Sequence, residues 1–216
     1  MKQATIAQLG AGTAQAGGAQ GSVPMWMTAF EKDIDSRLKK SGHGLQPAAP
    51  SAMTMTAARM AQNYAQTKEY DNVLKITSLL ARDPDAASML SGEQVHQVIA
   101  QGLFGLAHKV ASDSKCSYKV QKTILLHVLG LLLEGGQRQA LVDIAKKPST
   151  PQKLASAAVA LFAHKKDRDA LAQIQEMGHD GMLAEFARRC VSLLDFELQK
   201  QADARREPKP APIGAF

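Results

Sequence analysis

Few side chains in this sequence have the type and spacing that catalysis requires. Cys116 stands close to Lys115 and Lys119, and nearby cations can lower the pKa of a thiol and make it nucleophilic. No candidate base accompanies the thiol in the sequence. Glu93 and His96 form a single Glu-x-x-His, whereas a di-iron site in a helical bundle needs two such motifs and two further glutamates. We therefore expect no catalytic residue, no metal site and no cofactor.

Other enzyme signatures are also missing from the sequence. It contains no G-x-x-x-x-G-K-[ST] phosphate loop and no G-x-S-x-G nucleophile elbow. Gly10 and Gly12 lie in a glycine-rich segment rather than between a strand and a helix, so they do not form a dinucleotide loop. His127 lies in an apolar run, where a hydrogen-bonded core histidine is more common than a base. These observations favour a binding protein over an enzyme.

Three basic pairs are the clearest charged features: Lys146-Lys147, Lys165-Lys166 and Arg188-Arg189. The net charge is +6 and the isoelectric point about 9.3, but no run of five like charges occurs. One interpretation is a solvated helix surface. In the other, stacked helix pairs bring equivalent ends onto one edge, so the first two pairs form a stripe for an acidic partner. A protein that binds nucleic acid through these pairs is the alternative function.

An amphipathic helix is predicted over residues 25–40, after Pro24. Its apolar stripe consists of Met27, Phe30, Ile34 and Leu38, and the only tryptophan, Trp26, lies beside it. A helix of this length is marginal alone in water, so it must dock. It can pack on its own domain or in the groove of a partner, and these five residues are the candidate protein-binding site.

The remaining elements are predicted to be helices as well. Hydrophobic residues make up 45% of the chain but aromatic residues only 5%, a mixture that favours close-packed helices. No window alternates with a period of two, so we expect no strand. The predicted helices span residues 54–66, 69–82, 92–111, 117–134, 137–147, 151–164, 167–177 and 180–203. Three of these helices contain similar segments, at residues 73–76, 140–144 and 170–174.

The ends of the chain and its cysteines bear on domain organisation and location. Residues 1–24 are rich in Gly, Ala and Gln, so we expect a disordered arm, with a linker at 41–52 and a flexible tail at 204–216. Two cysteines without a C-x-x-C favour a reducing compartment, and no signal peptide is evident. The most apolar run, Ile124 to Leu133, is too short to span a membrane. These features predict a cytoplasmic protein.

Residues 57–84 resemble one degenerate tetratricopeptide (TPR) unit. Tyr64 lies where such units carry a tyrosine in the first helix, Tyr70 begins the second helix, and Asp83-Pro84 ends the unit. The chain departs from the pattern at Ala57, Lys68 and Val73, where the family has tryptophan, glycine and a small residue. The resemblance implies an α-solenoid-like fold and a protein-binding role. It implies no particular partner.

These observations together predict an all-α, TPR-like α-solenoid over residues 53–203, a helical array of about eight helices. We expect a non-enzymatic protein–protein interaction module: an adaptor, chaperone or assembly component, such as one of a bacterial multiprotein machine. The expected partner is another protein. The sequence does not indicate the oligomeric state.

Overall fold

The structure is a computed structural model that describes residues 24–41, 52–90, 94–177 and 181–206. Within those residues it contains a short 3-10 helix, Ser88–Leu90, and no strand. The α-helices of the described residues are α1 Met25–Ser41, α2 Ala52–Gln66, α3 Tyr70–Arg82, α4 Gln94–Ser112, α5 Tyr118–Glu134, α6 Arg138–Lys146, α7 Gln152–His164, α8 Arg168–Met177 and α9 Gly181–Arg206.

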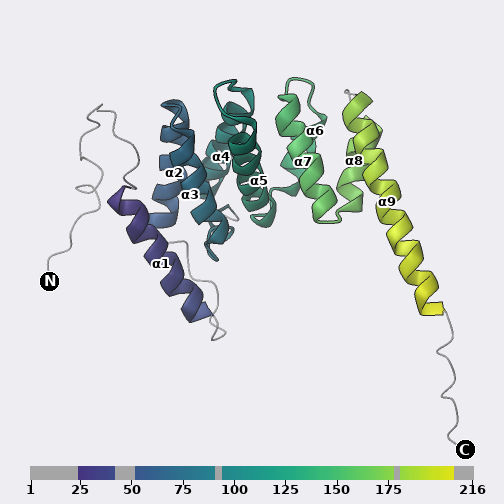
Figure 1. The fold of residues 1–216 in the computed structure, drawn as a ribbon, viewed down its shortest axis with the longest axis horizontal. Helices are drawn as coiled ribbons and strands as arrows, with labels where there is room; N and C mark the ends of the chain where they lie inside the picture. Colours follow the sequence, from purple (N-terminus) through teal and green to yellow (C-terminus); the bar gives the residue numbers. More distant parts are fainter. Residues whose placement is uncertain (1–23, 42–51, 91–93, 178–180, 207–216) are drawn as a thin grey trace, which may run out of the picture.

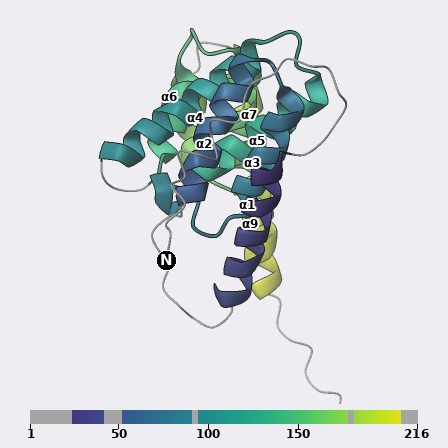
Figure 2. The ribbon, with the colours of Figure 1, turned by 90° about the vertical axis from the view of Figure 1, so that its left-hand side faces the viewer.

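The helices follow one another along a row and form two layers (Figure 1). Viewed along the row, α2, α4 and α6 lie on one side and α1, α3, α5, α7 and α9 on the other (Figure 2). Each helix of the odd-numbered layer contacts the next member of that layer, and in the even-numbered layer α2 contacts α4 and α6 contacts α8. This stacking buries one continuous apolar core along the array. The predicted all-α helical array is therefore confirmed.

Three helical hairpins share one turn geometry. In the α2–α3, α5–α6 and α7–α8 turns, one residue takes a left-handed conformation: Lys68 at φ 65°, Gly136 at φ 81° and Lys166 at φ 56°. The next residue in each turn donates its backbone N–H to the carbonyl five positions back, at 2.9 Å each time. This hydrogen bonding is the Schellman motif. The three second helices contain the segments that look alike in the sequence.

Side-chain bonds at the start of the second helices connect successive units. Arg138, the first residue of α6, donates to both carboxylate oxygens of Asp167 at 2.6 and 2.7 Å. Thirty residues on, Arg168 begins α8 and bonds both oxygens of Asp195 in α9 at 2.6 and 3.0 Å. The fork of a guanidinium matches a carboxylate, so each bond fixes the orientation of both groups.

The central helix α5 contributes much of the core. Its apolar run buries Ile124, Leu125, Val128, Leu129, Leu131 and Leu132. The helix ends at Glu134 with Gly135 as its C-cap, and a Cβ at position 135 would lie 2.5 Å from the Cβ of Leu90. No side chain other than hydrogen fits there. The close approach seats the C-terminal end of α5 against the 3-10 helix.

All predicted helices are present, with ends within three residues of those expected. α9 runs to Arg206, beyond the predicted end at residue 203. The predicted arm at 1–24, except for Pro24, lies outside the described residues, as do residues 42–51 of the linker and the tail after Arg206. No helix in the described part of the chain is long and apolar enough to cross a bilayer.

Candidate functional site

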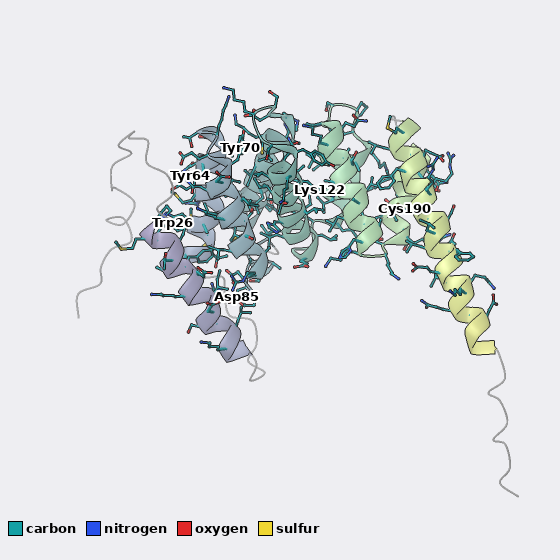
Figure 3. All side chains as sticks on the ribbon, viewed as in Figure 1. Trp26, Tyr64, Tyr70, Asp85, Lys122 and Cys190 are labelled. Carbon is teal, nitrogen blue, oxygen red and sulfur yellow. The ribbon has the colours of Figure 1, made fainter. Side chains whose placement is uncertain are left out.

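The helix predicted to dock through an apolar stripe is α1, and it packs on its own chain. Met27, Phe30 and Ile34 are 1%, 0% and 0% exposed and belong to the common core, and α1 lies against α3. Trp26 is half-buried at the start of the helix (Figure 3). In this structure the three buried side chains therefore face the body of the protein, which is the internal one of the two docking alternatives.

Arg37, and not the predicted Leu38, is the side chain near the end of α1 that turns toward the body of the protein. Leu38 is 41% exposed, whereas Arg37 turns inward between α1 and the α3 terminus. Position 37 follows Phe30 and Ile34 at spacings of seven and three, so it lies on the edge of the same stripe. The docking surface of α1 therefore ends in a cation rather than in a fourth apolar residue.

Arg37 is held by a compact cluster of carboxylates. Its Nη1 lies 2.6 Å from Asp83 and 3.0 Å from Asp85, and the Asp83 side chain is fully buried. Asp83 also accepts from the Thr54 hydroxyl at 2.6 Å. Burial opposes the guanidinium charge, but the bonds to Asp83 and Asp85 outweigh it and raise the pKa of Arg37. The cluster fixes the lower half of α1 beside Asp85 (Figure 3).

The first two basic pairs do not form the expected single stripe. Lys146 and Lys147 precede α7, whereas Lys165 and Lys166 follow it, so the pairs lie at opposite ends of that helix. Thirteen residues of α-helix separate them by about 20 Å. The α6–α7 and α7–α8 loops accordingly lie at opposite edges of the array (Figure 1). Consecutive antiparallel helices place their C-terminal ends at opposite edges, and this is why the prediction of a stripe was wrong.

Most of these cations are paired on the surface. Lys165 lies 3.1 Å from Glu134 and Lys166 lies 2.7 Å from Glu197. Arg188 and Arg189 both bind Glu185, at 2.6 and 3.0 Å. All of these side chains are substantially exposed, which is the solvated-surface interpretation of the basic pairs.

A groove of about 340 Å³ lies on the odd-numbered layer, between α5, α7 and α9. Its walls are largely apolar: Leu125 and Leu126 from α5, Ala157 and Ala160 from α7, and Phe186 from α9. Tyr118 also lines the groove and is 70% exposed, while Phe186 is 40% exposed. An apolar hollow with two exposed aromatic rings is a surface suited to an anchoring side chain of a partner.

Two lysines flank this groove. Lys122 of α5 and Lys153 of α7 both line it and both are exposed. Within the part of the chain that the structure describes, neither lysine forms an ion pair. Lys122 projects from α5 toward α7 on the face shown in Figure 3. The groove therefore combines an apolar floor with two positive charges that no described carboxylate pairs.

Gln121 supplies a polar atom at the base of the groove. Its side chain is 1% exposed, and its Nε2 donates to the carbonyls of Val110 and Ala111 at the end of α4. Those bonds fix the orientation of the amide and satisfy carbonyls left open at a helix end. The Oε1 atom is buried and accepts no hydrogen bond from any described residue. A buried acceptor without a donor costs free energy.

The candidate nucleophile has none of the activation that its sequence neighbours suggested. Cys116 is 4% exposed. Burial raises the pKa of its thiol, and the negative charge of Asp113 adds to the effect. Among the described residues, no group of three His, Cys, Asp or Glu side chains could hold a metal ion. Glu93 lies outside the described residues, and so does the side chain of His96.

A second hollow, of about 260 Å³, lies on the other side of α5 against the end of α3. His127 lines it and is half-buried, with an Nδ1 that has no hydrogen-bond partner among the described residues. Burial lowers the pKa of this histidine. His127 therefore lies at the edge of the core. The hydrogen bond that the sequence led us to expect for it is not formed by its Nδ1 with any described residue.

The sequence patterns did not identify the residues that line the groove. Tyr118 and Lys122 of the groove are four residues apart, and the groove residue Phe186 is four residues from the exposed Met182, so each pair lies on one side of its helix. These pairs stand outside the apolar stripes that form the core. A second, partly apolar stripe on a helix that already has a core-facing stripe is the signal that could have identified this surface.

The structure thus defines an all-α helical array with a lysine-flanked apolar groove. Comparisons of the chain with known protein families, with curated proteins and with solved structures found no match.

Proposed function

We propose that this protein is a non-enzymatic protein–protein interaction module that binds an acidic, apolar segment of a partner protein in the groove between α5, α7 and α9. The observation that carries the proposal is the composition of the groove, in which an apolar floor lies beneath two exposed lysines that form no ion pair with any described residue. Uncompensated cations beside an apolar hollow favour a partner with carboxylates beside its apolar anchor.

The architecture supports the same role. Stacked helix pairs present extended surfaces assembled from several helices, and such surfaces commonly bind other proteins. The resemblance of residues 57–84 to a TPR unit agrees with this role. We infer a cytoplasmic adaptor, chaperone or assembly component, of the kind found in bacterial multiprotein machines. The largely apolar walls favour a protein over nucleic acid, because phosphates gain nothing from an apolar floor.

The test compares three forms of the full chain. The groove variant is Lys122→Glu with Lys153→Glu. The matched control is Lys119→Glu with Lys147→Glu, which changes the net charge equally at exposed lysines that do not line the groove. Each form is used to capture proteins from the native source, and each captured protein is then purified and titrated. We expect a partner whose affinity falls about tenfold or more with the groove variant only.

The chemistry of the bound segment is tested separately. Peptides that tile the identified partner are titrated against the wild type, and we expect binding by a peptide with an apolar anchor flanked by Asp or Glu. Equal capture by the groove variant and the wild type would contradict the proposal. Binding of single-stranded nucleic acid that weakens steeply with salt and is lost in the groove variant would support the nucleic-acid alternative instead.

A further inference from the structure

The last helix of the array has exposed apolar side chains away from the core. The inner face of α9 buries Leu183 and Ala187, whereas Leu193 and Phe196 are 65% and 68% exposed. The terminal unit of a helical array normally has a polar outer face, because no further unit covers it. A large aliphatic and an aromatic side chain exposed at this end therefore indicate a surface that becomes covered.

α9 also extends beyond the units that support it. Arg168, at the start of α8, bonds Asp195, and Lys166 in the preceding turn bonds Glu197. The helix continues from there to Arg206, and Figure 1 shows it projecting past the edge of the array. A second helix therefore has room to lie along this part of α9.

Five residues lie along one narrow face of α9, from the part beside α8 into the part that projects. Their successive spacings are four, three, four and three, which is the spacing of a coiled-coil seam. In chain order they are Arg189, Leu193, Phe196, Lys200 and Asp203. We refer to them as the α9 seam.

The charges of the α9 seam are self-complementary in one direction only. Arg189 and Asp203 each lie seven residues from Phe196, on opposite sides of it. When two copies of α9 pair antiparallel about Phe196, Arg189 of each copy faces Asp203 of the other copy. The aliphatic stem of Lys200 then covers Leu193 of the other copy. A parallel pair would set each charge against the same charge, which is unfavourable.

We propose that two copies of this chain associate through the α9 seam as an antiparallel helix pair. The interface is isologous, with Phe196 on the twofold axis, an apolar centre and two Arg189–Asp203 ion pairs at its ends. In one copy Arg189 bonds Glu185 at 3.0 Å and Asp203 accepts from Gln199 at 2.9 Å. These are exposed contacts worth little, so exchanging them for contacts across the interface costs little. Tyr118, Lys122 and Lys153 of the groove are not part of the α9 seam.

The first experiment measures the mass of the full chain in solution by light scattering and sedimentation equilibrium. We expect the wild type to dimerise in a concentration-dependent manner. Leu193→Asp with Phe196→Asp should give a monomer with unchanged helix content by circular dichroism. The control Val98→Asp, at a site that is 64% exposed on α4, should leave the dimer intact. A monomeric wild type, or a dimer indifferent to the seam variant, would overturn the proposal.

The second experiment tests the direction of the pairing by charge exchange. Arg189→Asp alone and Asp203→Arg alone should each raise the dissociation constant about tenfold, because each sets like charges opposite one another. The two changes together should restore it to within about twofold of the wild type. Failure of the combined variant to recover would refute the antiparallel register. Deletion of residues 207–216 should leave the dimer unchanged, and a dimer that formed only after this deletion would show that the tail is the occupant of the seam.

Discussion

Arg37 of α1 and Asp83, at the end of α3, are joined by two side-chain hydrogen bonds, from Nη1 to Oδ1 at 2.6 Å and from Nη2 to Oδ2 at 3.1 Å. The Asp83 side chain has no exposed surface, and that of Arg37 is 17% exposed. A carboxylate so completely removed from water requires compensation, and Arg37 is the cation that provides it. Arg37 of α1 therefore provides the counter-ion for a buried carboxylate that lies in the body of the array.

Removing this cation should destabilise the protein considerably. We expect Arg37→Ala to lower the free energy of unfolding by about 3 kcal/mol, because it leaves a buried carboxylate without its counter-ion. The control is Arg82→Ala, which removes exposed ion pairs to Glu31 and Asp35 and should cost about 0.5 kcal/mol. Urea unfolding of both variants gives the comparison. Equal losses would show that the Arg37 cluster contributes no more than a surface pair.

The apolar side of the same docking contact makes a separate prediction. Phe30→Ala with Ile34→Ala should lower the free energy of unfolding by about 4 kcal/mol or more, since both side chains are fully buried. Trp26 fluorescence should shift to longer wavelength as α1 leaves α3. The control Thr28→Ala with Ser36→Ala changes exposed positions of α1 and should do neither. A stable double variant that loses a binding partner instead would indicate docking on that partner.

The sequence predicted the helices well because their ends are defined locally. Gly135 and Gly136 stop α5, Pro84 follows α3, and the apolar stripes have helical spacing. The burial of Arg37 was not predictable in this way. Its counter-ion is separated from it by 46 residues, and only the packing of α1 on α3 brings the two together.

The candidate groove was beyond the sequence analysis for a related reason. Its walls come from α5, α7 and α9, so Lys122 and Lys153 become neighbours only after these helices stack. The predicted basic stripe required the two lysine pairs to lie at equivalent ends of stacked helix pairs, but one pair ends α6 and the other follows α7. The direction of each helix decides the edge, and antiparallel neighbours alternate.

The core of α5 provides a further stability prediction. Leu129 is 0% exposed, so Leu129→Ala should cost about 2–5 kcal/mol through the lost apolar contacts and the cavity left behind. Val98→Ala, at a site that is 64% exposed, is the comparison and should change stability by less than about 0.5 kcal/mol. Thermal unfolding followed by circular dichroism measures both. An unchanged melting curve for Leu129→Ala would contradict the burial of this helix.

The repeated turn allows a stabilising substitution. Lys166 has φ 56°, a conformation that costs a residue with a Cβ about 1 kcal/mol relative to glycine. Lys166→Gly should therefore raise the melting temperature, as the equivalent position 136 already carries glycine. Lys165→Gly is the matched control. Lys165 has φ −78°, which any residue adopts without strain, so this substitution should not raise the melting temperature. Both changes remove one exposed ion pair, so that loss cancels in the comparison.

His127 should make stability depend on pH just below neutrality. Burial lowers its pKa in the folded protein below the ordinary value of 6.5, so the folded state holds fewer protons than the unfolded state between the two pKa values. Stability is then fully present above pH 6.5 and falls as the pH drops toward the lowered pKa. Urea unfolding of the wild type and of His127→Gln, measured across this range, isolates the contribution, since the other histidines are common to both proteins. The difference in unfolding free energy between the two should change in favour of the variant as the pH falls. A difference that stays constant with pH would mean that His127 binds protons equally well in the folded and unfolded states.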